Sequence, residues 1–179
     1  MFLNVTISLL QSLAATMEIF FLTLLFSLPL GLVIAFGAMS KWAPLRFLLY
    51  GQEAPSALTR TLAAFRPIGT VCGILVWIIR GTPLMLQLFF VYYGLPIMFG
   101  PAFRMENTVA AVLTFTMNYA AYFAEIYRAG VQSIDHGQHE AAKTLGFSRW
   151  QTMRIIIIPQ TIARVIPPVS NEVITLIKD

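Results

Sequence analysis

The chain has 179 residues, of which 58% are hydrophobic and only 11% are charged, and its formal net charge is +4. Soluble domains contain about 25% charged residues, so this chain has too little polar surface to cover a water-soluble globule. The composition excludes a soluble, disordered, collagen-like or coiled-coil protein and indicates lipid as the solvent. The single cysteine, Cys72, can form no intrachain disulfide and is predicted to be a small packing residue.

The first predicted membrane span covers residues 15–40. The stretch from Ile19 to Ser40 carries no charge over 22 residues. At about 1.5 Å per residue, a helix of that length crosses a hydrocarbon core of about 30 Å. A cleaved signal peptide needs a basic segment before its apolar run, whereas the first basic residue here is Lys41, so we interpret the stretch as a span.

A second span is predicted over residues 81–99, because the stretch from Gly81 to Phe103 is uncharged. Thr82 is expected to cap this helix, with Pro83 at its first position. The preceding apolar run, Pro67–Ile79, has only 13 residues. We therefore expect it to lie at the membrane interface or to pack against a neighbouring helix.

A third span is predicted over residues 107–127 and a fourth over residues 155–177. The third is uncharged from Asn107 to Ala124. The fourth has a weaker apolar pattern, because prolines and charges interrupt it, namely Pro159, Arg164, Pro167, Pro168 and Glu172. The connection over residues 43–66 is expected to be a loop or an interfacial helix without a catalytic site.

The basic residues predict the orientation of the chain. Nine of the twelve Lys and Arg residues fall in two connections, with Lys41, Arg46, Arg60, Arg66 and Arg80 in the first and Arg128, Lys143, Arg149 and Arg154 in the second. By the positive-inside rule both connections are cytoplasmic, which places the N-terminus outside. This topology and the anionic inner-leaflet lipid explain the net charge, so no nucleic acid partner is expected.

The segment 133–154 is polar and is predicted to form a helical hairpin. The run Gln138–Leu145 consists of good helix formers, and Gly146 is a typical residue to follow a helix end. Ser148 and Gln151 have the spacing of a capping box, which predicts the start of a second helix. Such a hairpin can press a short helix end into a groove of another protein.

Several strings of this sequence occur in the order found in one family of membrane proteins. In chain order they are Arg80–Leu84, Gln87–Phe90, Glu125–Gly130, Gly137–Ala142, Leu145–Gly146, Ile158–Gln160, Asn171 and Lys178–Asp179. The four strings from Glu125–Gly130 to Ile158–Gln160 resemble the EAA signature of the membrane subunits of bacterial ABC importers, and Asn171 and Lys178–Asp179 extend the resemblance to the end of the sequence. The two upstream strings resemble the polar amino acid uptake branch, the relatives of histidine and glutamine permeases. Their joint occurrence in order makes the resemblance specific.

The resemblance implies an all-α integral membrane protein of the bacterial cytoplasmic membrane, the core of a type I ABC importer permease with about four spans. It implies cytoplasmic ATPase subunits, a second permease subunit and an extracytoplasmic amino acid-binding protein as partners, and no cofactor. Consistently, the sequence has no Gly-rich loop ending in Gly-Lys-Ser/Thr that would bind a nucleotide. Family members continue with Thr-Ser-Leu and a final span, so the chain is expected to be truncated.

The resemblance also assigns coupling to the ATPase to the hairpin. The expected coupling residues are Gly137, Glu140, Ala141, Ala142, Gly146 and Arg149. The two alanines allow close approach, Gly146 allows the turn, and Arg149 meets acidic groups of the ATPase. Glu140 is expected to cap a helix or form a salt bridge in that contact. ATPase closure would then move the spans as rigid bodies during alternating access.

Ionisable residues in or beside the spans are the candidates for the substrate path, namely Glu18, Glu125, Arg164 and Glu172. An amino acid carries a carboxylate and an ammonium group, so an Arg and a Glu suit it chemically. The structural alternative is a place at the membrane interface, with a snorkelling side chain. His136 and His139 have no further ligand nearby, so no metal site is predicted.

Two other functional classes remain open from the sequence. A self-sufficient channel or ion-coupled transporter would need no ATPase, although no inverted repeat relates the two halves of the chain. A membrane-tethered regulator would use the hairpin as a DNA-binding helix-turn-helix. The short tether to apolar spans disfavours the regulator.

Overall fold

The computed structural model describes residues 2–44, 56 and 64–179, and these residues form helices without any β-strand. The long helices are α1 (Phe2–Ala38), α3 (Pro67–Arg80), α6 (Asn107–Gln132) and α9 (Ile158–Lys178). The all-α class predicted from the sequence is confirmed. Most of the predicted connection 43–66 lies outside the described residues.

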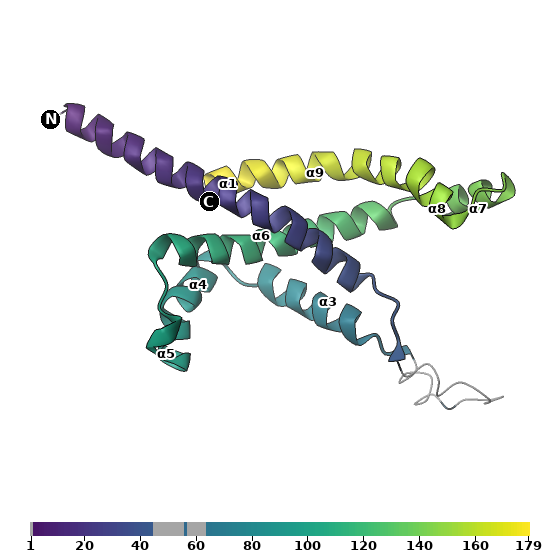
Figure 1. The fold of residues 1–179 in the computed structure, drawn as a ribbon, viewed down its shortest axis with the longest axis horizontal. Helices are drawn as coiled ribbons and strands as arrows, with labels where there is room; N and C mark the ends of the chain where they lie inside the picture. The colour runs from purple at the N-terminus through teal and green to yellow at the C-terminus, as the bar shows by residue number, and fades with distance from the viewer. Residues whose placement is uncertain (1, 45–55, 57–63) are drawn as a thin grey trace.

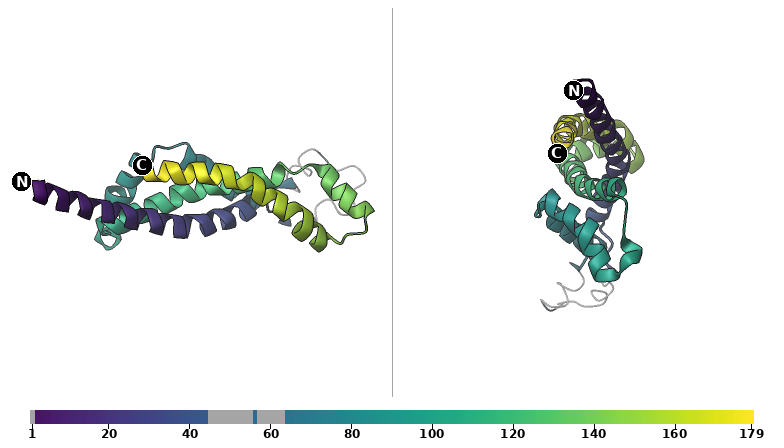
Figure 2. Two further views of the ribbon diagram at one scale, coloured as in Figure 1. Left: turned by 90° about the horizontal axis from the view of Figure 1, so that it is seen from above. Right: turned by 90° about the vertical axis from the view of Figure 1, so that its left-hand side faces the viewer.

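Helices α1 and α6 cross and pack closely, with α9 and α3 on opposite sides of α6 (Figures 1 and 2). Their crossing depends on Gly31, where a Cβ atom would lie 2.8 Å from the Cβ of Phe123 and 3.0 Å from the carbonyl oxygen of Ala120. Small residues allow helix backbones in a membrane to approach this closely. Beside the crossing, Tyr119 and Phe123 form a buried cluster with Leu176 of α9.

Two of the described helices are long and apolar enough to cross a membrane, namely Val5–Ala38 and Asn107–Gln132. They contain most of the predicted spans 15–40 and 107–127. Helix α9 does not meet the same criterion, because its prolines and charges reduce its apolar character. Its crossing of the membrane therefore stays a prediction.

The second predicted span is part of a broken helix. Helix α3 packs against α1 and α6, as expected for a run too short to cross alone. After a turn at residues 81–83 the chain continues as α4 (Leu84–Phe89), a π-helical turn, η2 (Phe90–Gly94), and α5 (Leu95–Phe99). The axes before and after the turn differ by 105°, and the two halves together could make one further span.

The predicted cap at Thr82 is wrong. Pro83 occupies the N-cap position of α4, and no side chain caps that helix. The hydroxyl of Thr82 instead donates hydrogen bonds to the carbonyl oxygens of Ile78 at 3.0 Å and Ile79 at 3.2 Å. These carbonyls at the end of α3 lack helical partners. The hydroxyl therefore donates to the last carbonyls of α3 and does not accept from the first N–H groups of α4.

The polar segment forms the predicted hairpin at the end of the molecule opposite to the N-terminus (Figures 1 and 2). It consists of α7 (His136–Thr144), a turn, and α8 (Arg149–Gln151). A π-helical turn, η4 (Thr152–Ile157), then leads directly into α9. The hairpin is therefore continuous with the last long helix.

Candidate substrate cavity and coupling hairpin

The glycine turn of the hairpin has the geometry that the sequence predicts. Gly146 has φ = 77°, a left-handed conformation in which glycine avoids the steric cost of a side chain. Its N–H donates to the carbonyl oxygen of Lys143, and the N–H of Phe147 donates to that of Ala142, each at 3.0 Å. This pair of bonds is a Schellman motif, which satisfies carbonyls at the end of α7.

Side chains cap the starts of both short helices. At α7, the carboxylate of Asp135 accepts a hydrogen bond from the N–H of Gly137 at 2.7 Å. At α8 the predicted capping box is confirmed, because Ser148 Oγ accepts from the N–H of Gln151 at 3.3 Å and Gln151 Oε1 accepts from the N–H of Ser148 at 2.8 Å. Local bonds therefore define the start of each short helix of the hairpin.

Most of the predicted coupling residues are exposed. Ala142 is the exception, because it is fully buried within the hairpin and supports its internal packing. Glu140 lies 3.2 Å from Nδ1 of His136, one helical turn earlier. Leu145 and Trp150, which were not among the expected coupling residues, have exposed fractions of 73% and 70%. The sequence pattern that could have pointed to them as contact residues is a large apolar residue on each side of the glycine turn, in a segment that is mostly polar.

Polar bonds join the hairpin to the beginning of α9. The guanidinium group of Arg164 donates to the carbonyl oxygen of Ser133, where α6 ends. Gln160 Nε2 donates to Gln138 Oε1 of α7 at 3.1 Å. Arg164 therefore lies beside the hairpin and not in the polar cavity described below.

A polar cavity of about 490 Å³ lies where the broken helix meets α6 and α9. Its lining residues are Arg80, Gly81, Thr82, Pro83 and Leu84 at the break, Asn118, Tyr119 and Tyr122 of α6, and Glu172, Thr175 and Asp179 at the end of α9. The volume is within the range of about 300–1,000 Å³ that is typical of small-molecule sites. Of the predicted substrate-path residues, Glu172 is the one that lines this cavity.

Charges of both signs face this cavity. The guanidinium carbon of Arg80 lies 5.0 Å from the centre of the Tyr122 ring, in a cation–π arrangement. The hydroxyl of Tyr119 donates to the carboxylate of Asp179. Within the described residues the ion pairs are Glu125–Arg128 and His136–Glu140, so neither Arg80 nor Glu172 is in an ion pair, and their opposite charges attract each other across the cavity. The cavity therefore offers a guanidinium group and a carboxylate that are not held in an ion pair.

Arg80 was missed as a candidate because the sequence analysis counted it as a cation of a cytoplasmic connection. The structure places it as the last residue of α3, a helix packed on α1 and α6. The signal that could have found it is its position directly before a Gly and a Pro that interrupt an apolar run, since broken helices line substrate sites in transporters. The other basic residues still fall mainly in the two predicted cytoplasmic connections, so the predicted orientation does not depend on Arg80.

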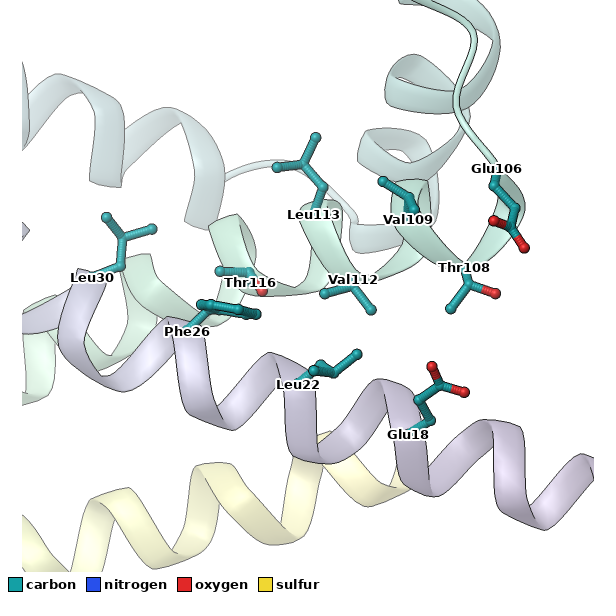
Figure 3. A pocket seen from close by; sticks show the side chains of 10 residues that line it. All are labelled: Glu18, Leu22, Phe26, Leu30, Glu106, Thr108, Val109, Val112, Leu113 and Thr116. Atoms are coloured by element: carbon teal, nitrogen blue, oxygen red, sulfur yellow. The ribbon is translucent and has the colours of Figure 1, made fainter.

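The two remaining candidates lie elsewhere. Glu125 pairs with Arg128 on the same helix and faces a smaller cavity of about 390 Å³ beside α3. Glu18 is at one end of a groove of about 730 Å³ between α1 and α6, whose other walls are mainly apolar (Figure 3). Glu106 and Thr108 lie at the same end of that groove (Figure 3). The groove is larger than the polar cavity but lacks a basic side chain.

The break beside Arg80 is held by a polar clamp made of Gln87 and Asn118. Gln87 Nε2 donates to the carbonyl oxygen of Ile79 at 2.7 Å and to the carbonyl and hydroxyl oxygens of Thr82 at 3.1 Å and 2.7 Å. Its Oε1 accepts from Nδ2 of the buried Asn118 at 3.0 Å. Backbone carbonyls freed by a helix break are costly in an apolar environment, so the clamp stabilises the bend.

We predict that Gln87→Met, which keeps the length of the side chain, lowers the free energy of unfolding by about 1–3 kcal/mol, because the buried amide of Asn118 loses its hydrogen-bond acceptor and the carbonyls at the break lose a donor. Thermal unfolding in detergent measures the effect, with Gln11→Met on the exposed part of α1 as the control. Asn118→Leu and the double variant complete a cycle with an expected coupling energy of about 1 kcal/mol. Additive effects of the two changes would contradict the clamp.

These features, a helical bundle with a broken helix, a polar cavity and a helical hairpin at one end, define a membrane transporter subunit. The model of the family described as binding-protein-dependent transport system inner membrane component matches residues 56–179. The chain belongs to this family, the membrane subunits of ABC importers. Family and apolar helices together make it a multi-pass protein of the inner membrane.

Similar proteins include amino acid permeases. The arginine transport system permease protein ArtQ of Bacillus subtilis (strain 168) is 42% identical over 118 residues, 66% of this chain and 53% of ArtQ. The glutamine transport system permease protein GlnP of Escherichia coli (strain K12) is 43% identical over 109 residues, 61% of this chain and 49% of GlnP. The chain thus spans about half the length of these curated relatives.

A solved structure has the same fold. The crystal structure of an amino acid ABC transporter with histidines matches with a TM-score of 0.72 and 31% sequence identity, covering 96% of this chain and 72% of the other. This agreement confirms that the helical arrangement is that of an ABC amino acid transporter permease.

Proposed function

We propose that the chain is the translocation subunit of an ATP-driven importer for a polar amino acid. The observation that carries the proposal is the polar cavity, in which Arg80 and Glu172 are not held in an ion pair and face the same space. The guanidinium group binds the α-carboxylate of the cargo, and a carboxylate binds its α-ammonium group. The names of the permeases to which the chain is similar support this cargo class.

The hairpin is the proposed contact with a separate ATPase. Its tip exposes Leu145 and Trp150 beside the rigid turn at Gly146, a combination suited to an apolar pocket of a partner. Arg149 and Glu140 are exposed next to them and complement charges around that pocket. A second permease subunit and an extracytoplasmic amino acid-binding protein complete the proposed complex.

The proposed orientation has the hairpin in the cytoplasm and the N-terminus outside. The basic residues of the two connections favour it by the positive-inside rule. The position of the hairpin and the N-terminus at opposite ends of the molecule is compatible with it (Figure 1). The substrate cavity then lies between the two aqueous phases, as alternating access requires.

Reconstitution of the full complex in proteoliposomes tests the proposal. We expect ATP-dependent uptake of a polar amino acid, and we expect Arg80→Gln to reduce it about 10- to 100-fold, because a charge-assisted hydrogen bond is lost. Arg104→Gln, a change at an exposed arginine outside the cavity, is the control. Unchanged uptake by Arg80→Gln would contradict the cavity assignment, and failure of an ATPase to co-purify after mild detergent extraction would contradict the coupling assignment.

A further inference from the structure

The groove between α1 and α6 is only about half as long as a membrane span. On α1 its lining runs from Glu18 to Leu30, which at about 1.5 Å per residue is about 18 Å of helix. Directly after Leu30, α1 and α6 come into close contact at Gly31 and Ala120. One leaflet of a hydrocarbon core of about 30 Å is about 15 Å thick, so the groove has the length of a single leaflet.

The groove has an acidic mouth and mainly apolar walls. Glu18 and Glu106 lie on its opposite walls at one end, with Thr108 beside them (Figure 3). Neither carboxylate is in an ion pair within the part of the chain that the structure describes, and Arg104 does not line the groove. Apart from the buried Thr116 at the inner end, the remaining lining residues are apolar, namely Leu22, Phe26, Leu30, Val109, Val112 and Leu113.

This combination matches a phospholipid better than a helix of another protein. A spanning helix crosses the whole hydrocarbon core, whereas close packing at Gly31 closes the groove at about half that length. Phe26 and Val109 are each 52% exposed, so the apolar walls are open to the surrounding alkyl chains. An alkyl chain laid along these walls places its polar head group at the two carboxylates.

We infer that the groove binds phosphatidylethanolamine, with its ammonium group at Glu18 and Glu106 and one alkyl chain along the apolar walls. An ammonium group has three N–H donors, and its hydrogen bonds to carboxylates are strengthened by charge. The same two carboxylates repel an anionic head group such as that of phosphatidylglycerol. The inference is independent of the proposed cargo, because it uses neither the polar cavity nor the hairpin.

The experiment measures lipid binding to the permease–ATPase complex by native mass spectrometry. The complex is purified in mild detergent, depleted of lipid, and titrated with three phospholipids that have identical acyl chains. We expect phosphatidylethanolamine to bind at least about tenfold more tightly than phosphatidylglycerol, because its head group makes charge-assisted bonds to the carboxylates. Phosphatidylcholine should bind with intermediate affinity, because its head group keeps the positive charge but has no N–H donor.

Two sets of variants test the two parts of the site. The double variant Glu18→Gln, Glu106→Gln should abolish the preference for phosphatidylethanolamine, whereas Glu18→Asp, Glu106→Asp keeps both charges and should retain it. Leu113→Trp fills the apolar part of the groove and should weaken the binding of all three lipids. Leu25→Trp is its matched control, because Leu25 is an exposed residue of α1 that does not line the groove.

Three results would overturn the inference. The first is equal affinity of the native complex for phosphatidylethanolamine and phosphatidylglycerol. The second is a preference that persists in the double glutamine variant, because the head group would then be recognised elsewhere. The third is an equal effect of Leu113→Trp and Leu25→Trp, because the alkyl chain would then lie outside the groove or another protein segment would cover it. None of these results contradicts the proposed amino acid transport.

Discussion

Replacement of Gly146 by valine is expected to uncouple amino acid transport from ATP hydrolysis. A Cβ atom at this position meets no other atom within 4 Å, so crowding is not the cause. The cause is the backbone, because φ = 77° costs a non-glycine residue about 1–2 kcal/mol, and a β-branched residue more. Valine therefore opens the Schellman turn and displaces the exposed tip of the hairpin from its proposed partner.

The measurement is the number of ATP molecules hydrolysed per amino acid taken up in proteoliposomes. We expect Gly146→Val to reduce uptake by at least about tenfold while basal ATP hydrolysis continues. Gly146→Asn is the matched control, because asparagine tolerates the left-handed conformation better than other residues with side chains, and it should retain most of the coupling. Normal uptake by Gly146→Val would contradict the coupling role of the hairpin.

The substitution Gly31→Leu is expected to be strongly destabilising. A Cβ alone would lie 2.8 Å from the Cβ of Phe123 and 3.0 Å from the carbonyl oxygen of Ala120. Neither of these atoms belongs to the mobile end of a side chain, so α1 and α6 must separate. Overpacking of this kind costs about 1–3 kcal/mol or more in free energy of unfolding.

Thermal unfolding in detergent, followed by size-exclusion chromatography, measures the effect. Gly31→Ala should lower the midpoint, and Gly31→Leu should lower the recovery of folded protein further. Gly73→Ala is the control, because a Cβ on Gly73 of α3 meets nothing within 4 Å. Alanine is the better helix former, so Gly73→Ala should be neutral or stabilising. Equal behaviour of the two alanine variants would refute the close crossing of α1 and α6.

The hairpin could be predicted from the sequence because local bonds determine it. Gly146 after α7, and the Ser148 and Gln151 pair that caps the start of α8, act within a few residues of chain, so their spacing alone carries the information. The same reasoning failed at Thr82, because its hydroxyl can either accept from the first N–H groups of α4 or donate to the last carbonyls of α3. That choice depends on how α3 ends, which the local sequence does not specify.

The cavity could be predicted only in part, because its lining residues come from distant segments. Glu172 was found as an ionisable residue in an apolar helix, which is a local signal. Arg80 required knowledge that α3 packs on α6, so that a residue counted with a connecting loop faces Tyr122 instead. Gln87 and Asn118 are neutral and 31 positions apart, and no periodicity relates them.

The bonds of Arg164 and Gln160 connect α9 to the hairpin, and the other end of α9 lines the polar cavity, so this helix links the two proposed functional regions. Its beginning is tied to the hairpin, and its last turns carry Glu172 and Asp179, with 21 residues and therefore about 30 Å of helix between its ends. Under the proposed function, a tilt imposed where the ATPase docks would be passed to these carboxylates along a helix that contains Pro167 and Pro168. If the cargo binds at these carboxylates as proposed, thermodynamic reciprocity requires that its binding change the affinity of the ATPase for the hairpin.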